Sequence, residues 1–261
     1  MNETNKFLTF FTMLVYTFLI GPLVIITVTA FSGESYLSFP PESFSLQWFF
    51  NIFQVDMFVR TFRVSLEIAV IGTVLALLIG IPVAYALSRF DFFGKSILSN
   101  FFLSPVVIPM VVLGYALLKF LVINMGIPYY RGLLIGHTIV ILPYVVRVIS
   151  SSLMNFNYTV EEAAMSLGCN RLHAFFVVVL PNIRSGIIAA FILAFINSFN
   201  NVPVSVFLTG PGISTLPIQM LSYVEYYFDP TISALSVVLM IITVIIMFAI
   251  EKTLGLTHFA K

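Results

Sequence analysis

Two adjacent carboxylates, Glu161 and Glu162, could cap the start of a helix or contact a partner. Thr159 and Glu162 have the spacing of a capping box, in which the threonine hydroxyl accepts a hydrogen bond from the amide of Glu162 and the carboxylate accepts one from the amide of Thr159. A short helix is therefore expected to begin near Val160. Capping alone would explain Glu162, and contact of its remaining lone pairs with a partner is the alternative.

The residues that follow carry signals that end this helix and begin another. Gly168 is placed to end the first helix in the left-handed conformation, and Asn170 is placed to cap a second helix. Pro181 lies near the end of that second helix, about where a later apolar segment begins. The piece 172–180 is strongly apolar but too short to cross a bilayer.

The first of these helices has an apolar face. Val160, Ala163, Ala164 and Leu167 fall at i, i+3, i+4 and i+7, which places them on one side. Small side chains allow a close approach of another backbone, whereas a solvated helix would need no apolar face. An exposed patch of this kind usually marks a docking site, so we expect a partner to cover it.

Polar residues inside apolar segments are candidates for function by default. Arg63 and Glu67 are four residues apart on a helix and could pair, either as an ion pair at an interface or with Glu67 at the mouth of a pathway. Asn197 and Asn201 have the spacing of one helical face, and Asn200 lies beside them. Hydrogen bonds between helices and contact with a polar solute are both compatible with these amides.

The other reactive side chains favour structural roles. His137 and Arg147 could belong to a proton relay, but His137 has no carboxylate four residues away and Arg147 can extend to lipid headgroups. Cys169 is the single cysteine and is expected to be a small packed residue. The sequence has no phosphate-binding G-x-x-x-x-G-K-[ST], no H-E-x-x-H, no G-x-S-x-G and no metal-ligand spacing. We therefore expect no catalytic residue, metal or cofactor in this chain.

Apolar segments must position these residues. The 261-residue chain is 60% hydrophobic and 9% charged, against about 25% charged residues in soluble domains. A bilayer removes the need for a charged surface. The expected fold class is an all-α integral membrane protein, with residues 1–261 as one domain. The six expected spans lie near 7–31, 65–87, 96–118, 132–152, 185–208 and 231–250, with a connecting segment at 155–181.

Charge and aromatic patterns indicate the orientation. Eight cations fall on one side and four on the other, which predicts that both termini are cytoplasmic. The inner set is Lys6, Arg89, Lys95, Arg147, Arg171, Arg184, Lys252 and Lys261, and the outer set is Arg60, Arg63, Lys119 and Arg131. In the outer loop 32–61, aromatics such as Trp48 favour contact with membrane lipid over a docking surface for an external protein. The net charge of +1 argues against a nucleic-acid partner.

The spacing Glu162-Ala163-Ala164, three residues, Gly168, nine residues and Val178-x-Leu180-Pro181 resembles the EAA signature of ABC-importer permeases, which usually have isoleucine in place of Val178. The stretches 84–95, 104–109 and 209–217 resemble further segments of that family, the last one in its spermidine/putrescine branch. The resemblance implies a coupling helix that sits in a groove of a cytoplasmic ATPase. The coupling residues it implies are Glu161, Glu162, Ala163, Ala164, Leu167, Gly168 and Pro181.

The resemblance also implies the partners and the cargo. It implies a bacterial inner-membrane location, an ABC ATPase dimer that binds ATP and magnesium, a second and usually different permease, and an external solute-binding protein. Glu67, Asn197, Asn200 and Asn201 would line a pathway between the two permeases for a small polar organic solute. Spermidine-type permeases often carry acidic residues where this chain has Asn200 and Asn201, so a zwitterionic solute is expected alongside a polyamine-like one. The alternative function is a secondary transporter driven by an ion gradient, which would need carboxylates near the midplane and an inverted repeat.

Overall fold

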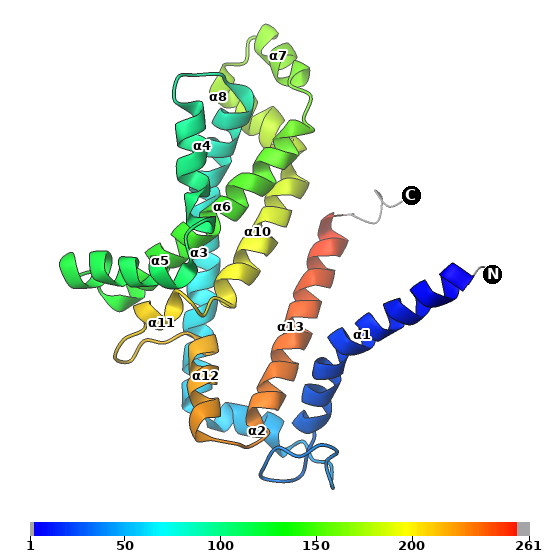
Figure 1. Ribbon diagram of the computed structural model, residues 1–261. Helices are drawn as coiled ribbons and strands as arrows, with labels where there is room; N and C mark the ends of the chain where they lie inside the picture. The colour runs from blue at the N-terminus through cyan, green and yellow to red at the C-terminus, as the bar shows by residue number, and fades with distance from the viewer. Residues whose placement is uncertain (1–2, 255–261) are drawn as a thin grey trace. The chain divides into compact units, whose positions relative to one another are not determined.

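The computed structural model describes residues 3–254, and the regular elements in that range are helices (Figure 1). The α-helices are α1 (Glu3–Ala30), α2 (Gln47–Gln54), α3 (Asp56–Arg89), α4 (Lys95–Leu103), α5 (Met110–Leu117), α6 (Tyr129–Met154), α7 (Thr159–Ser166), α8 (Arg171–Ala174), α9 (Leu180–Asn182), α10 (Arg184–Phe199), α11 (Ser205–Leu208), α12 (Leu216–Tyr226) and α13 (Thr231–Leu254). A 3₁₀ turn, η1 (Ser104–Val106), and two π-helical segments, η2 (Leu118–Asn124) and η3 (Phe175–Val179), join some of them.

Three of these helices are long and apolar enough to cross a bilayer, namely α1 from Lys6 onward, α3 and α6. Two further candidates are bent pairs. Lys95–Val106 and Met110–Asn124 meet at 98°, and Arg171–Asn182 and Arg184–Phe199 meet at 72°. The last helix holds a shorter apolar run, Thr231–Ile245. The expected all-α membrane fold is confirmed, and the limits of the six spans remain predictions. Lys261, counted for the orientation, lies outside the described residues, as does the side chain of Lys252.

The helix expected over 96–118 is broken rather than straight, and prolines cause the break. Pro105 lies in η1, and Pro109 has the extended backbone angles φ −54° and ψ 125° just before α5. A proline donates no backbone hydrogen bond and disfavours helical geometry in the residue before it. The chain therefore leaves α4 at Ser104 and restarts as α5 at Met110.

The chain divides into two compact units. One unit holds the described residues up to Arg60 together with Gln219–Ala249, and the other is formed mainly by Thr61–Ile218. In the first unit, the Thr29 hydroxyl donates to Ser233 Oγ at 3.1 Å, and the Asn51 amide donates to Thr231 Oγ1 at 2.9 Å. These two bonds join the end of α1 and α2 to the start of α13.

The core of the second unit is centred on α6. Its side chains Ile141, Val145 and Ile149 are fully buried, and Ala190 and Ala194 of α10 are fully buried against the same cluster. Without a hydrophobic driving force in lipid, small residues at helix contacts permit the close packing that holds a bundle together. This core sets the positions of the ends of α3, α6 and α10, near which the candidate site lies.

A buried histidine joins α6 to the end of α10 and to the start of α11. The two ring nitrogens of His137 lie 2.9 Å from the hydroxyls of Ser198 and Ser205. The Ser205 hydroxyl donates to the backbone oxygen of Asn201 at 2.6 Å, so in a neutral ring Nε2 donates to Ser205 and Nδ1 accepts from Ser198. These hydrogen bonds of His137 form a contact between packed helices, which is the structural role favoured for His137 from the sequence.

Candidate coupling site

The helix α7 begins differently from the prediction. Asn157 Oδ1 accepts hydrogen bonds from the Thr159 amide at 3.0 Å and from the Thr159 hydroxyl at 2.8 Å. The amide of Glu162 donates to the backbone oxygen of Tyr158 at 3.1 Å. The predicted capping box is therefore wrong, because Thr159 is already the first helical residue and its hydroxyl donates rather than accepts.

The end of α7 and the start of α8 agree with the prediction. Gly168 has a φ of +98°, and the following amide of Cys169 donates to Ala164 O at 3.1 Å, as in a glycine-terminated helix. Asn170 Oδ1 accepts from the amide of His173 at 2.8 Å and caps α8. Pro181 lies exposed in α9, next to the 72° bend that leads into α10.

The two glutamates of α7 have opposite environments, although they are adjacent. Glu161 is 0% exposed, and the hydroxyl of Tyr85 on α3 donates a hydrogen bond to it. Arg89, at the end of α3, places Nε 3.3 Å from Glu161 Oε2 and Nη2 2.6 Å from Glu162 Oε1. The Nε contact is at ion-pair distance but lacks hydrogen-bond geometry, so charge rather than a directed bond holds that oxygen. Arg89 thus binds α7 to α3 through both carboxylates.

Aromatic rings enclose this ion pair. The Arg89 guanidinium lies 4.8 Å from the ring centre of Tyr158, and the ring of Tyr85 lies 4.8 Å from that of Phe175. Burial disfavours the charged form of Arg89, but the carboxylates of Glu161 and Glu162 beside it favour that form. Burial and the nearby Glu161 raise the pKa of the Tyr158 hydroxyl. The cluster therefore keeps Arg89 charged.

In the sequence, Tyr85 and Arg89 lie in the family-like stretch 84–95 and Arg89 also counts among the inner cations, but nothing there pairs either residue with α7. One local signal was present, because these residues are four apart at the end of an apolar helix and so share a face. Their partner carboxylates lie more than 70 residues later in the chain. No helical period links positions so far apart.

The predicted apolar face of α7 lies on the surface. Val160 is 48% exposed and Leu167 is 89% exposed, Ala163 is exposed and Ala164 is partly buried. Glu162 keeps about half of its side-chain surface, 53%, open beside this face. The site therefore consists of an anchored side, through Glu161, and an open apolar side. Exposed apolar patches of this kind usually mark interaction sites.

The predicted pathway residues are spread over several local structures. Arg63 Nε donates to Glu67 Oε1 at 2.8 Å, which confirms the predicted pairing, and the hydroxyl of Tyr130 donates to Glu67 Oε2 at 3.3 Å. The Asn197 amide donates to Leu193 O of its own helix at 2.8 Å. Glu67 is therefore tied to α6 through Tyr130.

The expected common face of Asn197 and Asn201 is wrong, because α10 ends at Phe199. Asn200 is exposed at the helix end, whereas Asn201 is buried and its Oδ1 accepts a hydrogen bond from the amide of Val204 at 3.1 Å. This bond orders the turn before α11. Asn201 thus has a structural partner that the sequence did not indicate.

Comparisons with known proteins agree with this architecture. Residues 72–255 match the family described as "Binding-protein-dependent transport system inner membrane component". The chain is 32% identical over 235 residues to the putrescine transport system permease protein PotI of Escherichia coli (strain K12), covering 87% of this chain and 83% of the relative. It is 28% identical over 253 residues to the spermidine/putrescine transport system permease protein PotC of the same strain, covering 95% of each.

Solved structures share the fold. The crystal structure of a bacterial ABC transporter involved in the import of alginate has a TM-score of 0.73 at 16% identity and covers 97% of this chain and 98% of that chain. An inward-facing structure of the MetNI methionine ABC transporter has a TM-score of 0.63 at 20% identity and covers 77% of this chain and 96% of that chain. The chain accordingly belongs to the family of inner-membrane components of binding-protein-dependent transport systems, as a permease subunit of an ABC importer.

Proposed function

We propose that this permease couples to a separate ATPase through the exposed apolar face of α7. The observation that carries the proposal is the two-sided environment of that helix. Glu161 is buried and held by Tyr85 and Arg89, whereas Val160, Ala163 and Leu167 face outward. Glu162 and the apolar face are then the parts available to a partner, and Glu161 acts by fixing α7 to α3.

The assembly we propose has four kinds of component. A second permease supplies the other half of the translocation pathway, and an ABC ATPase dimer binds ATP and magnesium. An external protein delivers the solute. The chain lies in the bacterial inner membrane with both termini cytoplasmic, since the larger set of cations falls on the side that holds α7. Movement of α7 with the ATPase would pass to α3 through the contact between Arg89 and its two carboxylates.

The solute we propose is a small polar organic molecule, either polyamine-like or zwitterionic. Curated relatives named for putrescine and spermidine transport support the first class. The amides at Asn200 and Asn201 support the second, because a polycation would favour carboxylates there. Glu67, Asn197 and Asn200 are the proposed pathway residues, and Asn201 supports the turn beside them. Uptake measured after Asn200→Ala tests this, and unchanged affinity and rate would remove Asn200 from the pathway.

Cysteine labelling in whole cells tests the placement of α7. Ala163→Cys in a Cys169→Ser background should react with a membrane-impermeant maleimide only after the cells are opened. Glu42→Cys, in the loop predicted to be outside, is the matched control and should react in intact cells. Labelling of Ala163→Cys in intact cells would contradict the proposal.

A bulky residue on the apolar face tests the docking itself. Ala163→Trp should abolish uptake and ATPase binding, because the small side chain allows close approach, while leaving the permease inserted in the membrane. Ser166→Trp is the control, since Ser166 is also exposed on α7 but lies outside the apolar face. Normal uptake by Ala163→Trp, or equal loss in both variants, would refute docking through this face.

A further inference from the structure

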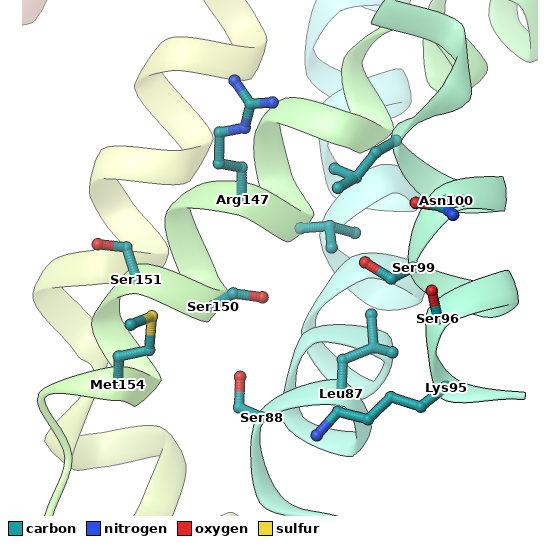
Figure 2. Close-up of a pocket in the computed structure, with 12 residues that line it drawn as sticks. Leu87, Ser88, Lys95, Ser96, Ser99, Asn100, Arg147, Ser150, Ser151 and Met154 are labelled. Carbon is teal, nitrogen blue, oxygen red and sulfur yellow. The ribbon is translucent and has the colours of Figure 1, made fainter. Parts of the chain in front are cut away.

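A pocket of about 820 Å³ lies between the ends of α3, α4 and α6, within the second unit (Figure 2). Its size falls in the range of small-molecule sites. Its lining is formed by Leu87 and Ser88 of α3, by Lys95, Ser96, Ser99, Asn100 and Leu103 of α4, and by Val146, Arg147, Ser150, Ser151 and Met154 of α6. None of the candidate coupling or pathway residues lines it.

The polar part of the lining is cationic and rich in hydroxyls. Figure 2 shows Lys95 reaching from α4 toward Ser88, whereas Arg147 extends from α6 at the other end of the pocket with its guanidinium directed away from Lys95. Ser99 and Ser150 point toward each other between these two cations. The lining contains no carboxylate, so its charge is positive. Hydroxyl donors between two cations suit an oxyanion such as a phosphate group.

The two cations differ in what already binds them. Lys95 Nζ pairs with Asp91 at 2.8 Å, but the Asp91 side chain is fully exposed and lies outside the pocket. Among the side chains that the structure describes (residues 6–245 and 248), no carboxylate lies at ion-pair distance from Arg147. A cation at the edge of a membrane-spanning helix usually extends to an anionic headgroup or pairs with a counter-charge. Arg147 therefore has its charge available for an anion from outside the chain.

The rest of the pocket is apolar. Leu87, Leu103, Val146 and Met154 form its walls. On the remaining surface of α4, Ile97 and Phe101 are exposed, as expected of a helix that faces lipid. A water-soluble anion would make no apolar contacts with these walls. A phospholipid presents a phosphate and the start of its acyl chains together, so it would contact both the cations and the walls.

We propose that this pocket binds the phosphate-bearing headgroup of an anionic phospholipid from the inner leaflet. The placement in the inner leaflet rests on the proposed function, because the pocket shares its end of the unit with the start of the loop that leads to α7. Basic pockets between membrane helices on the cytoplasmic side bind such headgroups. Lys95 pairs with the phosphate, Arg147 adds positive charge at the other end of the pocket, the serine hydroxyls donate to the phosphate, and the apolar walls hold the upper acyl chains.

Native mass spectrometry of the purified permease tests this site with defined ligands. Phosphatidylglycerol should bind at least about tenfold more tightly than phosphatidylcholine, because two cations each add attraction for an anionic lipid. Lys95→Gln with Arg147→Gln should remove that preference. Arg184→Gln, an exposed cation outside the pocket, is the matched control and should keep it. Equal binding of the two lipids, or an unchanged preference in the double variant, would overturn the proposal.

Two further measurements separate the remaining outcomes. Inorganic phosphate should compete poorly with phosphatidylglycerol for the pocket. If phosphate competes at equal concentration, and this competition is lost when Arg147 is replaced, the pocket binds a free anion instead. Ser99→Leu should weaken lipid binding by filling the pocket, and an unchanged unfolding temperature would show that the variant folds. The cysteine labelling at position 163 is independent of lipid. If the lipid proposal fails, the coupling role of α7 is therefore unaffected. Labelling of position 163 from outside would contradict the coupling role, and of the lipid proposal it would remove only the assignment to the inner leaflet.

Discussion

Replacing Arg89 with glutamine isolates the contact that holds α7 to α3. The variant leaves Glu161 buried with the hydroxyl of Tyr85 as its partner and releases Glu162. Removing one partner of a fully buried ion pair costs about 3–5 kcal/mol. The Arg89 side chain is 22% exposed, so solvent screening reduces this to about 2–3 kcal/mol. We expect α7 to detach locally rather than the whole chain to unfold.

Hydrogen exchange of peptides covering 159–168 measures this detachment. A cost of 2–3 kcal/mol corresponds to opening that is about 30- to 150-fold more frequent, and peptides from the middle of α6 should exchange as before. Arg63→Gln is the matched control, because the Arg63 side chain is 81% exposed and its pair with Glu67 is a surface pair. Such pairs contribute about 0–1 kcal/mol. Unchanged exchange of α7 in Arg89→Gln, or the same change in Arg63→Gln, would refute the reasoning.

Three other changes have defined outcomes. The Ser32 hydroxyl holds the pKa of Glu34 at about 2, below its usual 4.5. The contribution of this carboxylate to loop stability should therefore be present above pH 4.5 and lost as the pH falls through about 2. An NMR titration of the Glu34 carboxyl with a midpoint near 4.5 would contradict the contact with Ser32. Gly168→Val should lower stability by about 1–2 kcal/mol, because position 168 has a φ of +98°, and should reduce uptake. Normal uptake would show that coupling does not require a left-handed residue at position 168. Gly136→Val should lower the unfolding temperature in detergent, because its Cβ would lie 2.5 Å from Leu208 Cδ1, and an unchanged temperature would show that Leu208 moves aside.

The membrane fold and the local turns could be predicted from the sequence because each depends on nearby residues. A long apolar run in a bilayer must satisfy its own backbone hydrogen bonds, as a helix does, and α1, α3 and α6 follow from that rule. Gly168 and Asn170 act on backbone groups within a few residues, so their roles could be assigned from spacing alone.

The capping of α7 and the role of Asn201 could not be predicted, since each depends on where a helix starts or stops by a single residue. Asn157 competes with Thr159 as the first cap, and its side chain reaches the amide two residues on. At the other site, α10 stops at Phe199 before Asn201 is reached. A shift of one or two residues changes which side chain meets a free backbone group.

The partners of Glu161 depend on tertiary packing. Two adjacent glutamates look alike in the sequence, but one is buried and the other is half exposed because α7 packs one side toward Tyr85 and Phe175. Burial of a charge requires a partner, and that partner comes from α3. Only the three-dimensional arrangement distinguishes the anchoring glutamate from the accessible one.

Photo-cross-linking from the apolar face of α7 tests the central claim most directly. A photo-reactive amino acid at position 163, in the transporter as assembled in native membranes, should form a cross-link to a subunit that carries a phosphate-binding loop for ATP. The same amino acid at Phe101, which is exposed on α4 and which we expect to face lipid, should form none. Cross-links from position 163 that stay within this chain, with α7 folded and the permease transporting, would contradict the account.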